Sequence, residues 1–506
     1  MGPRFILVDA ELEGSGGHNA TYAGAALAAA EQLGYRPYLV TSRSAGVPGA
    51  VGRYSLGVVR ASARENVIAG GVAWNPGRSN GLKARLEQVF ALGRLVRTIA
   101  TGGFRRAART LEADLTALLG HDADCSEDVL FFPSAGAVEI RAARNLMAKA
   151  AFAGRIVLLL RRDPDYEPEE PAFLLRLRRQ RLRRTAKGLA ERVTLFSDTD
   201  ALARRYSELT AQTVRTAPIP VAPAEPDRVS EPVAVYLGDA RAEKGFSLLP
   251  KIARLSPDWR IRVQSNDNGA PDPTIASAKA ALAKLANIEL RPGPFSPETY
   301  QACLVRASVV LLPYAQASYR RRSSGIFAEA LAAGVPPLVS QGSWMAAVIQ
   351  PLEQEWLARN CLSGAAGGRR VARLELQKPV SAEMVALSLP GGQGEIRHAA
   401  PTLYFVLPEG EAGSELRVTD ERGRPQCYSL ELMWLPTDAP SSAVGVICAP
   451  NPEAFAAGLE ELQRFGPHYS RTAAEHAVSW RTRHSPSALV HAITTWRPDE
   501  TPVEGL

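Results

Sequence analysis

Short apolar runs recur along most of the chain, and each one ends in a polar or glycine-containing turn. Uninterrupted runs of this kind are typical of parallel strands that are buried on both faces. Segments with helical periodicity follow most of the runs, and this alternation predicts an α/β fold with parallel sheets. The runs expected to form strands are Arg4–Val8, Pro37–Val40, Val129–Phe132, Ile156–Leu160, Val193–Phe196, Val233–Leu237, Arg260–Gln264, Ile288–Leu290, Ala307–Leu312, Val444–Cys448 and the run that starts at Pro336.

Residues suited to helix capping precede several of the periodic segments. We expect Asn19 to cap a helix through Ala25–Leu33, and Asp198 or Asp200 to cap the helix that follows Val193–Phe196. The other expected helices are one after Ser296, one after Asn451, the pattern from Gly77 to Leu119 with an interruption at Gly102–Gly103, and Tyr469–Ile493.

The pattern changes to strand-like alternation between about Arg369 and Leu435, with glycine and proline turns between the apolar stretches. Several short strands without intervening helices predict a small β-sandwich inserted into an α/β domain. The strands expected there are Val371–Leu376, Val385–Leu389, Thr402–Leu407, Leu416–Thr419 and Tyr428–Trp434.

A chain of 506 residues is too long for a single hydrophobic core. The proline-rich stretch Thr216–Pro232 lacks periodicity and is the best candidate for an interdomain linker. The domains expected are an N-terminal α/β domain over 1–221, a second α/β domain over 230–350 plus 440–475, a β-rich insertion over 365–438, and a C-terminal helix within 476–506 that packs back on the first domain.

Composition restricts the class of protein. Apolar residues make up 46% of the chain, but no window reaches the roughly 18 uninterrupted apolar residues of a membrane span. The start of the chain, MGPRFILVDAELEG, turns acidic after a short apolar run, so it predicts a strand and not a signal peptide. Five scattered cysteines without metal-ligand spacing favour buried thiols in a reducing cytoplasm.

The net charge of +7 is modest for this length, and part of it is concentrated in Arg176–Arg184, which reads RLRRQRLRR. With Phe173, Leu174, Leu177 and Leu182 this stretch predicts a helix with a basic face. That face is either a solvated surface or a site for anionic lipid headgroups or a lipid-diphosphate acceptor. Because the basic runs contain no interleaved aromatic residues, we do not expect nucleic-acid binding.

Polar loops follow several strands of the predicted N-terminal sheet, at the end where open α/β sheets bind ligands. Gly16 and Gly17 end the loop after the first strand, and His18 follows them; the histidine either contacts substrate or hydrogen-bonds backbone. The spacing is not GxGxxG, which disfavours an NAD-dependent enzyme. Arg162 and Asp163 follow a later strand and are either ligand contacts or a structural ion pair.

Two further stretches suit phosphate chemistry. The loop Gly238–Gly245 carries Arg241 and Lys244 between glycines, which suits a diphosphate, although a basic surface loop is the alternative. Tyr319–Pro336 begins a helix with Ser323, Ser324 and Gly325, where free amides favour an anion, and Glu329 lies about one turn further in. An ordinary βαβ unit with a polar helix start is the alternative for this stretch.

Together, YLGDARAEKGF in the first stretch and SSGIFAEALAAGVP in the second resemble the retaining glycosyltransferases of family 4, which have the GT-B fold. The resemblance covers about residues 1–350 and 440–495 and leaves the β-rich insertion unmatched. It implies two facing Rossmann-like domains, a nucleoside diphosphate sugar as donor, and a glycan or lipid-linked glycan as acceptor. The expected role is polysaccharide, lipopolysaccharide or glycoprotein glycan assembly, with no metal or other cofactor.

The resemblance also implies roles for individual residues. Arg241 and Lys244 would bind the diphosphate, and Glu329 would hold the ribose hydroxyls. His18 would lie near the transferred sugar and, with the two cations, completes the expected catalytic set. The donor-binding residues expected from the resemblance are Gly16, Gly17, Phe295, Ser324, Gly325 and Glu329. Tyr319 and Arg322 are added from their position alone, as residues that would take over part of the site.

Three positions depart from the family pattern. Arg321 occupies the place of the first glutamate of the family's glutamate pair, and Asp239 stands where an arginine usually follows the glycine. Arg161–Arg162–Asp163 replaces a histidine loop. These departures leave open an alternative function, a catalytically silent binding or scaffold protein that uses the insertion and the basic helix for partner contacts.

Overall fold

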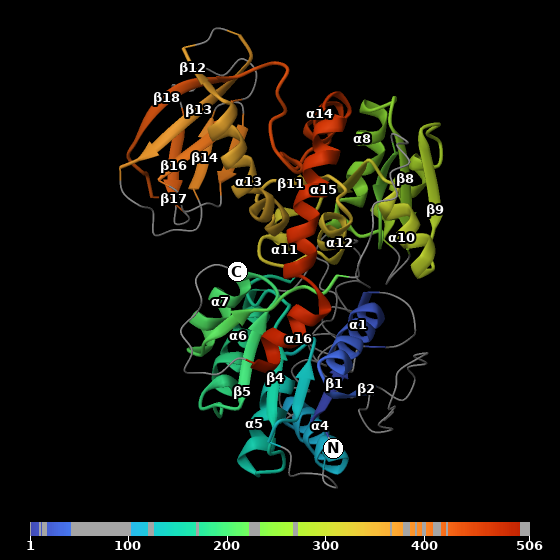
Figure 1. Cartoon of the computed structure of the whole chain (residues 1–506), viewed down its shortest axis with the longest axis vertical. Helices are drawn as coiled ribbons and strands as arrows, with labels where there is room; N and C mark the ends of the chain where they lie inside the picture. The colour runs from blue at the N-terminus through green and yellow to red at the C-terminus, as the bar shows by residue number, and fades with distance from the viewer. Residues whose placement is uncertain are drawn as a thin grey trace, which may run out of the picture. The chain divides into compact units, whose positions relative to one another are not determined.

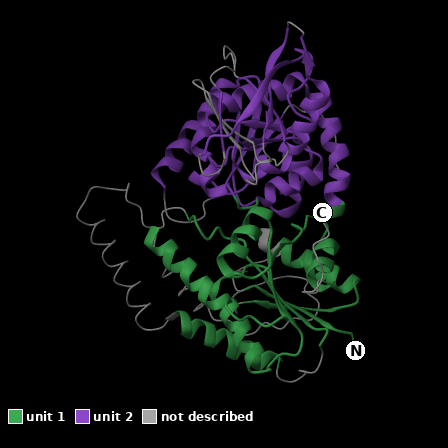
Figure 2. Ribbon diagram, turned by 90° about the vertical axis from the view of Figure 1, so that its left-hand side faces the viewer, with its two compact units in different colours: residues 1–222, 321–323, 482–506 green, residues 223–320, 324–481 purple. Residues whose placement is uncertain are grey.

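The computed structural model divides into two compact units (Figure 2). The first unit contains Met1–Ala222, Arg321–Ser323 and Thr482–Leu506, and the second contains Pro223–Arg320 and Ser324–Arg481. The residues that the structure describes are 2–9, 12, 18–41, 103–119, 126–167, 172–221, 233–266, 272–364, 367–377, 385–389, 392–396, 401–407, 416–420 and 424–495.

A six-stranded parallel sheet forms the centre of the first unit, with strand order β2-β1-β3-β4-β5-β6. The apolar runs are buried along their whole length in β1, β3 and β5, as expected for strands covered on both faces. The strands are β1 (Arg4–Asp9), β2 (Arg36–Thr41), β3 (Val129–Phe132), β4 (Arg155–Leu159), β5 (Val193–Ser197) and β6 (Val214–Thr216).

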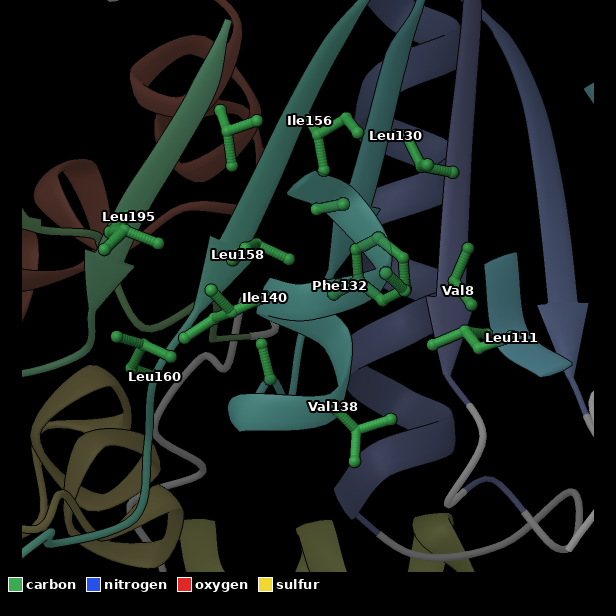
Figure 3. Close-up of a cluster of buried hydrophobic side chains, with 14 of the residues drawn as sticks. Val8, Leu111, Leu130, Phe132, Val138, Ile140, Ile156, Leu158, Leu160 and Leu195 are labelled. Atoms are coloured by element: carbon green, nitrogen blue, oxygen red, sulfur yellow. The ribbon is translucent and has the colours of Figure 1, made fainter. Parts of the chain in front are cut away.

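Helices cover both faces of this sheet. On one face, alternate strand residues such as Leu130, Ile156 and Leu158 pack with side chains from α4 and α5 in a buried cluster (Figure 3). On the other face, Phe131 and Val157 pack with α1 and α16. The helices of the unit are α1 (His18–Gln32), α4 (Gly103–Leu119), α5 (Ala137–Ala148), α6 (Ala172–Ala186), α7 (Asp200–Thr210) and α16 (Pro486–Thr495).

The second unit repeats this plan with a parallel sheet of order β19-β11-β10-β7-β8-β9. Its strands are β7 (Val233–Tyr236), β8 (Arg260–Ser265), β9 (Ile288–Pro292), β10 (Val309–Leu312), β11 (Pro337–Ser340) and β19 (Val446–Cys448). The surrounding helices, most of which are labelled in Figure 1, are α8 (Leu249–Leu255), α9 (Pro273–Leu282), α10 (Pro297–Val305), α11 (Gln316–Tyr319), α12 (Gly325–Ala333), α13 (Trp344–Asn360), α14 (Pro452–Arg464) and α15 (Gly466–Arg483).

The β-rich insertion leaves this unit after α13 and returns at β19. A four-stranded antiparallel sheet has the order β12-β18-β13-β16, and a three-stranded one has the order β15-β14-β17. Leu374 and Leu403 of the larger sheet share a buried core with Val418 of the smaller one, so the expected sandwich-like insertion is confirmed. Its strands are β12 (Leu362–Ser363), β13 (Arg369–Leu376), β14 (Val385–Leu389), β15 (Gly392–Ile396), β16 (Thr402–Val406), β17 (Arg417–Asp420) and β18 (Tyr428–Leu435).

Some of the expected element boundaries were wrong. Helix α7 is capped by Thr199, whose side chain accepts a hydrogen bond from the Leu202 amide, and not by Asp198 or Asp200. Helix α1 begins at His18, so Asn19 lies inside it and not before it. Tyr469–Ile493 is divided between α15 and α16. Gly103 starts α4, and the expected helical stretch before it lies outside the described residues.

The strand orders create one topological switch point in each sheet. In the second unit, β8 and β9 lie on one side of β7, whereas β10, β11 and β19 lie on the other. Open α/β sheets bind ligands beyond the carboxyl ends of the two strands at such a point. The loops that follow β7 and β10 are therefore positioned to form a ligand site. In the first unit the switch point lies between β1 and β3, because β2 lies on one side of β1 and the later strands lie on the other.

Two half-buried glutamates, Glu353 of α13 and Glu461 of α14, lie in the region where the insertion joins the second unit. Glu461 accepts hydrogen bonds from Arg369, the Ser441 amide and the Tyr469 hydroxyl. Burial, together with the negative charge of Glu461, raises the pKa of Glu353 to about 8. The side chain of Glu353 is thus protonated in the folded chain at neutral pH.

We expect the raised pKa of Glu353 to make the stability of the folded chain depend on pH. The folded carboxyl keeps its proton to about pH 8, whereas the unfolded one loses it near 4.5, so stability falls as pH rises through this window. Glu353→Gln should weaken the fall in thermal midpoint between pH 5 and 8. Glu355→Gln, at an exposed position of the same helix, is the control. An unchanged pH profile in Glu353→Gln would contradict the assignment.

Candidate functional site

The loop after β7 is shaped by glycines at both ends. Gly238 has φ +101° and donates its amide to the Gln264 side chain at 2.8 Å. Gly245 has φ +68°, and a Cβ at this position would lie 1.9 Å from the carbonyl oxygen of Pro313. Only glycine allows this approach, which brings the loop against the end of β10. The Ala315 amide donates to the Glu243 carbonyl at 2.8 Å and ties the two segments together.

The two cations of this loop lie on either side of one carboxylate. Arg241 Nη2 is 2.7 Å from Asp239 Oδ2, and Lys244 Nζ is 4.0 Å from the same oxygen. The Arg241 side chain is 41% exposed and the Lys244 side chain 15%. Asp239 is therefore an ion-pair partner of both cations. An anion with several oxygens can replace one carboxylate as their partner.

The start of α12 faces this loop. Ser324 caps the helix by accepting from the Phe327 amide at 3.3 Å, as the sequence indicates, and Gly334 ends it with φ +68°. A Cβ on Gly238 would lie 3.0 Å from Cδ1 of Ile326 and 3.3 Å from Nζ of Lys244. The glycine loop, the lysine and the first turn of α12 are thus in contact. A helix start beside a lysine is an arrangement suited to phosphate.

One site residue could not be identified from the sequence. The Tyr300 hydroxyl, on α10, donates a short hydrogen bond to Glu329 Oε2 on α12. Burial and the adjacent Glu329 carboxylate raise the pKa of Tyr300 well above its usual value, so the phenol stays protonated and orients the carboxylate. Phe295 lies half-buried in the segment that leads into α10. Tyr300 was missed because a tyrosine within a short helix has no distinguishing sequence signal.

The remaining expected donor-binding residues lie in different environments. Tyr319 is buried, and its ring centroid is 4.5 Å from that of Tyr314. Arg322 is half-buried in the tripeptide Arg321–Ser323, which belongs to the first unit. His18 is the first residue of α1. Gly16 and Gly17, and the side chain of His18, lie outside the described residues.

A polar network lies at the carboxyl ends of β4 and β5 in the first unit. Arg321, which replaces the family's glutamate, has Nη1 3.3 Å from Asp163 Oδ2 and 3.5 Å from Asp165 Oδ2. The Asp163 side chain is 1% exposed. Arg205 also binds Asp165, with Nη2 2.9 Å from Oδ1, and Arg179 binds the same oxygen at 2.8 Å. The ion-pair partner observed for Asp163 is thus Arg321, far along the chain.

A second cluster lies beside this network. Arg161 donates from Nε to Asp198 Oδ2 at 3.0 Å, and the Ser323 hydroxyl donates to the same oxygen at 2.5 Å. Arg161 also lies over the Tyr22 ring, with Cζ 5.4 Å from the centroid. Asp198, expected as a helix cap, instead holds a cation and a hydroxyl. The carboxyl ends of these strands therefore hold a largely buried polar network that contains both charges.

Among the residues that the structure describes, no three histidine, cysteine, aspartate or glutamate side chains lie close enough together to hold a metal ion. No helix within the same residues is long and apolar enough to cross a membrane.

The Asp163–Arg321 pair should stabilise the first unit. In a double-mutant cycle of Asp163→Asn and Arg321→Met, urea unfolding should give a coupling free energy of roughly 0.5–3 kcal/mol, because each single change leaves a poorly compensated charge. The matched control is the exposed pair Glu355–Arg359, whose side chains are 64% and 74% exposed and should couple little. Additive changes at 163 and 321 would show that the pair contributes nothing.

Comparisons with known proteins place this geometry in a fold class. No protein-family model matches the sequence, and no curated protein matches it. Sucrose-phosphate synthase from Thermosynechococcus elongatus is similar over 97% of both chains, with a TM-score of 0.55 at 9% identity. OtsA without ligand is similar over 99% of this chain and 100% of its own, with a TM-score of 0.53 at 11% identity.

A third similar structure is HepE from Anabaena in complex with UDP and glucose. It covers 97% of this chain and 98% of its own, with a TM-score of 0.50 at 8% identity. At such identities the likeness concerns the fold alone. The chain therefore has the GT-B fold, with two Rossmann-like units and a β-rich insertion in the second, and the predicted fold class is confirmed.

Proposed function

We propose that this protein is a glycosyltransferase that moves a sugar from a nucleoside diphosphate sugar to an acceptor hydroxyl. One observation carries the proposal: at the switch point of the second sheet, Gly238 lies against both the Lys244 ammonium and the Ile326 side chain in the first turn of α12. A diphosphate needs dense positive charge and several hydrogen-bond donors, and this position supplies both. HepE, which shares the fold, was solved with UDP and glucose.

The charge at this site suits stabilisation of a leaving group. As the bond between the sugar C1 and the diphosphate oxygen breaks, negative charge grows on the diphosphate. Lys244, Arg241 and the first amides of α12 are fixed in advance where that charge develops, and such groups typically contribute about 100-fold or more in rate each. Asp239 holds the cations until the diphosphate takes its place.

The transfer itself requires no dedicated base in this proposal. The acceptor oxygen forms the new bond to C1 on the face from which the diphosphate leaves, and a diphosphate oxygen takes the acceptor proton. The configuration at C1 is then retained. Since the side-chain cations neutralise the leaving group, we expect turnover to survive EDTA.

The acceptor is proposed to be a glycan or a lipid-linked glycan in polysaccharide, lipopolysaccharide or glycoprotein assembly. The polar network around Arg161 and Asp198 offers cations and carboxylates that can bind hydroxyl-rich molecules.

The diphosphate contacts can be tested with two probes, UDP and inorganic pyrophosphate. Lys244→Ala should weaken the binding of both about equally, by tenfold or more in calorimetry, because the lost contact is to phosphate. Lys251→Ala removes an exposed lysine of the same unit that pairs with Glu453, and it should leave both affinities unchanged. Equal binding by Lys244→Ala and wild type would exclude this loop as the diphosphate site.

Loss of the ribose contact should affect the two probes differently. Glu329→Gln should weaken UDP binding by roughly tenfold and leave pyrophosphate binding unchanged, since only UDP carries ribose hydroxyls. Tyr300→Phe, which frees the carboxylate from its hydrogen bond, should have a smaller effect in the same direction. If Glu329→Gln also lost pyrophosphate binding, Glu329 would be acting on the loop and not on the ribose.

Turnover separates the enzyme from a binding or scaffold protein. With a panel of UDP-, GDP- and dTDP-sugars, we expect binding together with slow hydrolysis of at least one donor, and a loss of about 100-fold or more in that rate in Lys244→Ala. Donor binding without hydrolysis or transfer to any acceptor would support the scaffold.

A further inference from the structure

Helix α6 (Ala172–Ala186) exposes large apolar side chains together with arginines. Phe173 is 49% exposed and Leu177 is 39% exposed. Arg176, Arg183 and Arg184 are exposed as well. In a helix, positions separated by three, four or seven residues share a face, so these five residues form one stripe. We call them the α6 stripe.

The other arginines of α6 have partners within the first unit. Arg178 pairs with Glu167 at 3.5 Å, and Arg179 pairs with Asp165 at 2.8 Å. The Arg181 guanidinium lies over the Phe104 ring, 4.7 Å from its centroid. The arginine run Arg176–Arg184 thus divides into an inner set that attaches the helix to the unit and an outer set on the stripe.

Leu182, Thr185 and Ala186 are buried and fix which face of the helix points outward. Charged side chains alone are enough for a helix face that contacts only water. Such a face does not need an exposed phenylalanine and an exposed leucine one turn apart. Apolar residues flanked by arginines are instead the composition of helices that lie in the headgroup region of a membrane. Long arginine side chains can reach the phosphates while the apolar side chains enter the acyl boundary.

We propose that the α6 stripe docks on the surface of an anionic lipid bilayer. Arg176, Arg183 and Arg184 supply the charge complementarity, and Phe173 and Leu177 insert between the headgroups. The contact holds the protein at the surface and requires no spanning helix. It rests on the exposed face of α6 and not on the proposed glycosyl transfer, so the two can fail independently.

Vesicle sedimentation tests the proposal with the full chain. Wild type should bind vesicles of phosphatidylcholine with 30% phosphatidylserine and bind pure phosphatidylcholine far less, and the binding should fall with added salt. The triple variant Arg176→Gln, Arg183→Gln, Arg184→Gln should partition roughly 100-fold more weakly, at about fivefold per arginine. Phe173→Ser with Leu177→Ser should reduce partitioning by roughly tenfold or more.

Matched controls come from exposed residues of the second unit. Arg254→Gln, Lys284→Gln and Arg471→Gln remove the same charge from exposed positions. Leu255→Ser with Val478→Ser removes two side chains that are 46% and 59% exposed. Both control variants should bind vesicles within about twofold to fivefold of wild type, since charge elsewhere acts only through screened long-range attraction. Circular dichroism of every variant checks that the fold is kept.

Three outcomes would overturn the proposal. The first is equal binding of wild type to anionic and neutral vesicles. The second is a stripe variant that binds as well as its control. The third is tight binding of wild type to heparin or RNA, lost in the arginine variant, with vesicle binding unaffected by Phe173→Ser and Leu177→Ser; that result would assign the stripe to a soluble polyanion.

Discussion

The candidate site depends on the close approach of two loops that follow neighbouring strands, β7 and β10. This approach requires a residue without a side chain, because any Cβ at Gly245 would fall 1.9 Å from the Pro313 carbonyl oxygen. The positive φ of Gly245 turns the chain at the same point. In the same loop, Gly238 lies close both to the Lys244 ammonium and to the Ile326 side chain in the first turn of α12. The position of the proposed diphosphate site thus depends on one backbone contact.

Much of the fold could be predicted from local sequence. Parallel strands buried on both faces need continuous apolar runs, and such runs mark β3, β7 and β10 directly. Ser324 and Gly334 bound α12 because a hydroxyl accepts from a free amide and a glycine adopts a left-handed backbone. Strand β15, GQGEI, was missed since its glycines carry no β propensity.

Contacts between distant residues could not be predicted in this way. Arg321 and Asp163 are 158 positions apart, so no local pattern pairs them. The bond from Tyr300 to Glu329 likewise depends on how α10 packs beside α12. Asp198 is a further example. Its position before a helix predicts a cap, but its Oδ2 accepts hydrogen bonds from Arg161 and from the Ser323 hydroxyl instead. The sequence thus shows which charged residues follow a strand. Which residues they pair with depends on the tertiary fold.

We propose that the β7 loop and the start of α12 bind a nucleoside diphosphate, and a crystal structure of the chain grown with UDP would show whether they do. The diphosphate is expected within hydrogen-bond distance of Lys244 and of the amides at Ser324–Gly325, with the ribose hydroxyls on Glu329. Ordered UDP bound elsewhere in the second unit, with Asp239 still holding both cations, would contradict it.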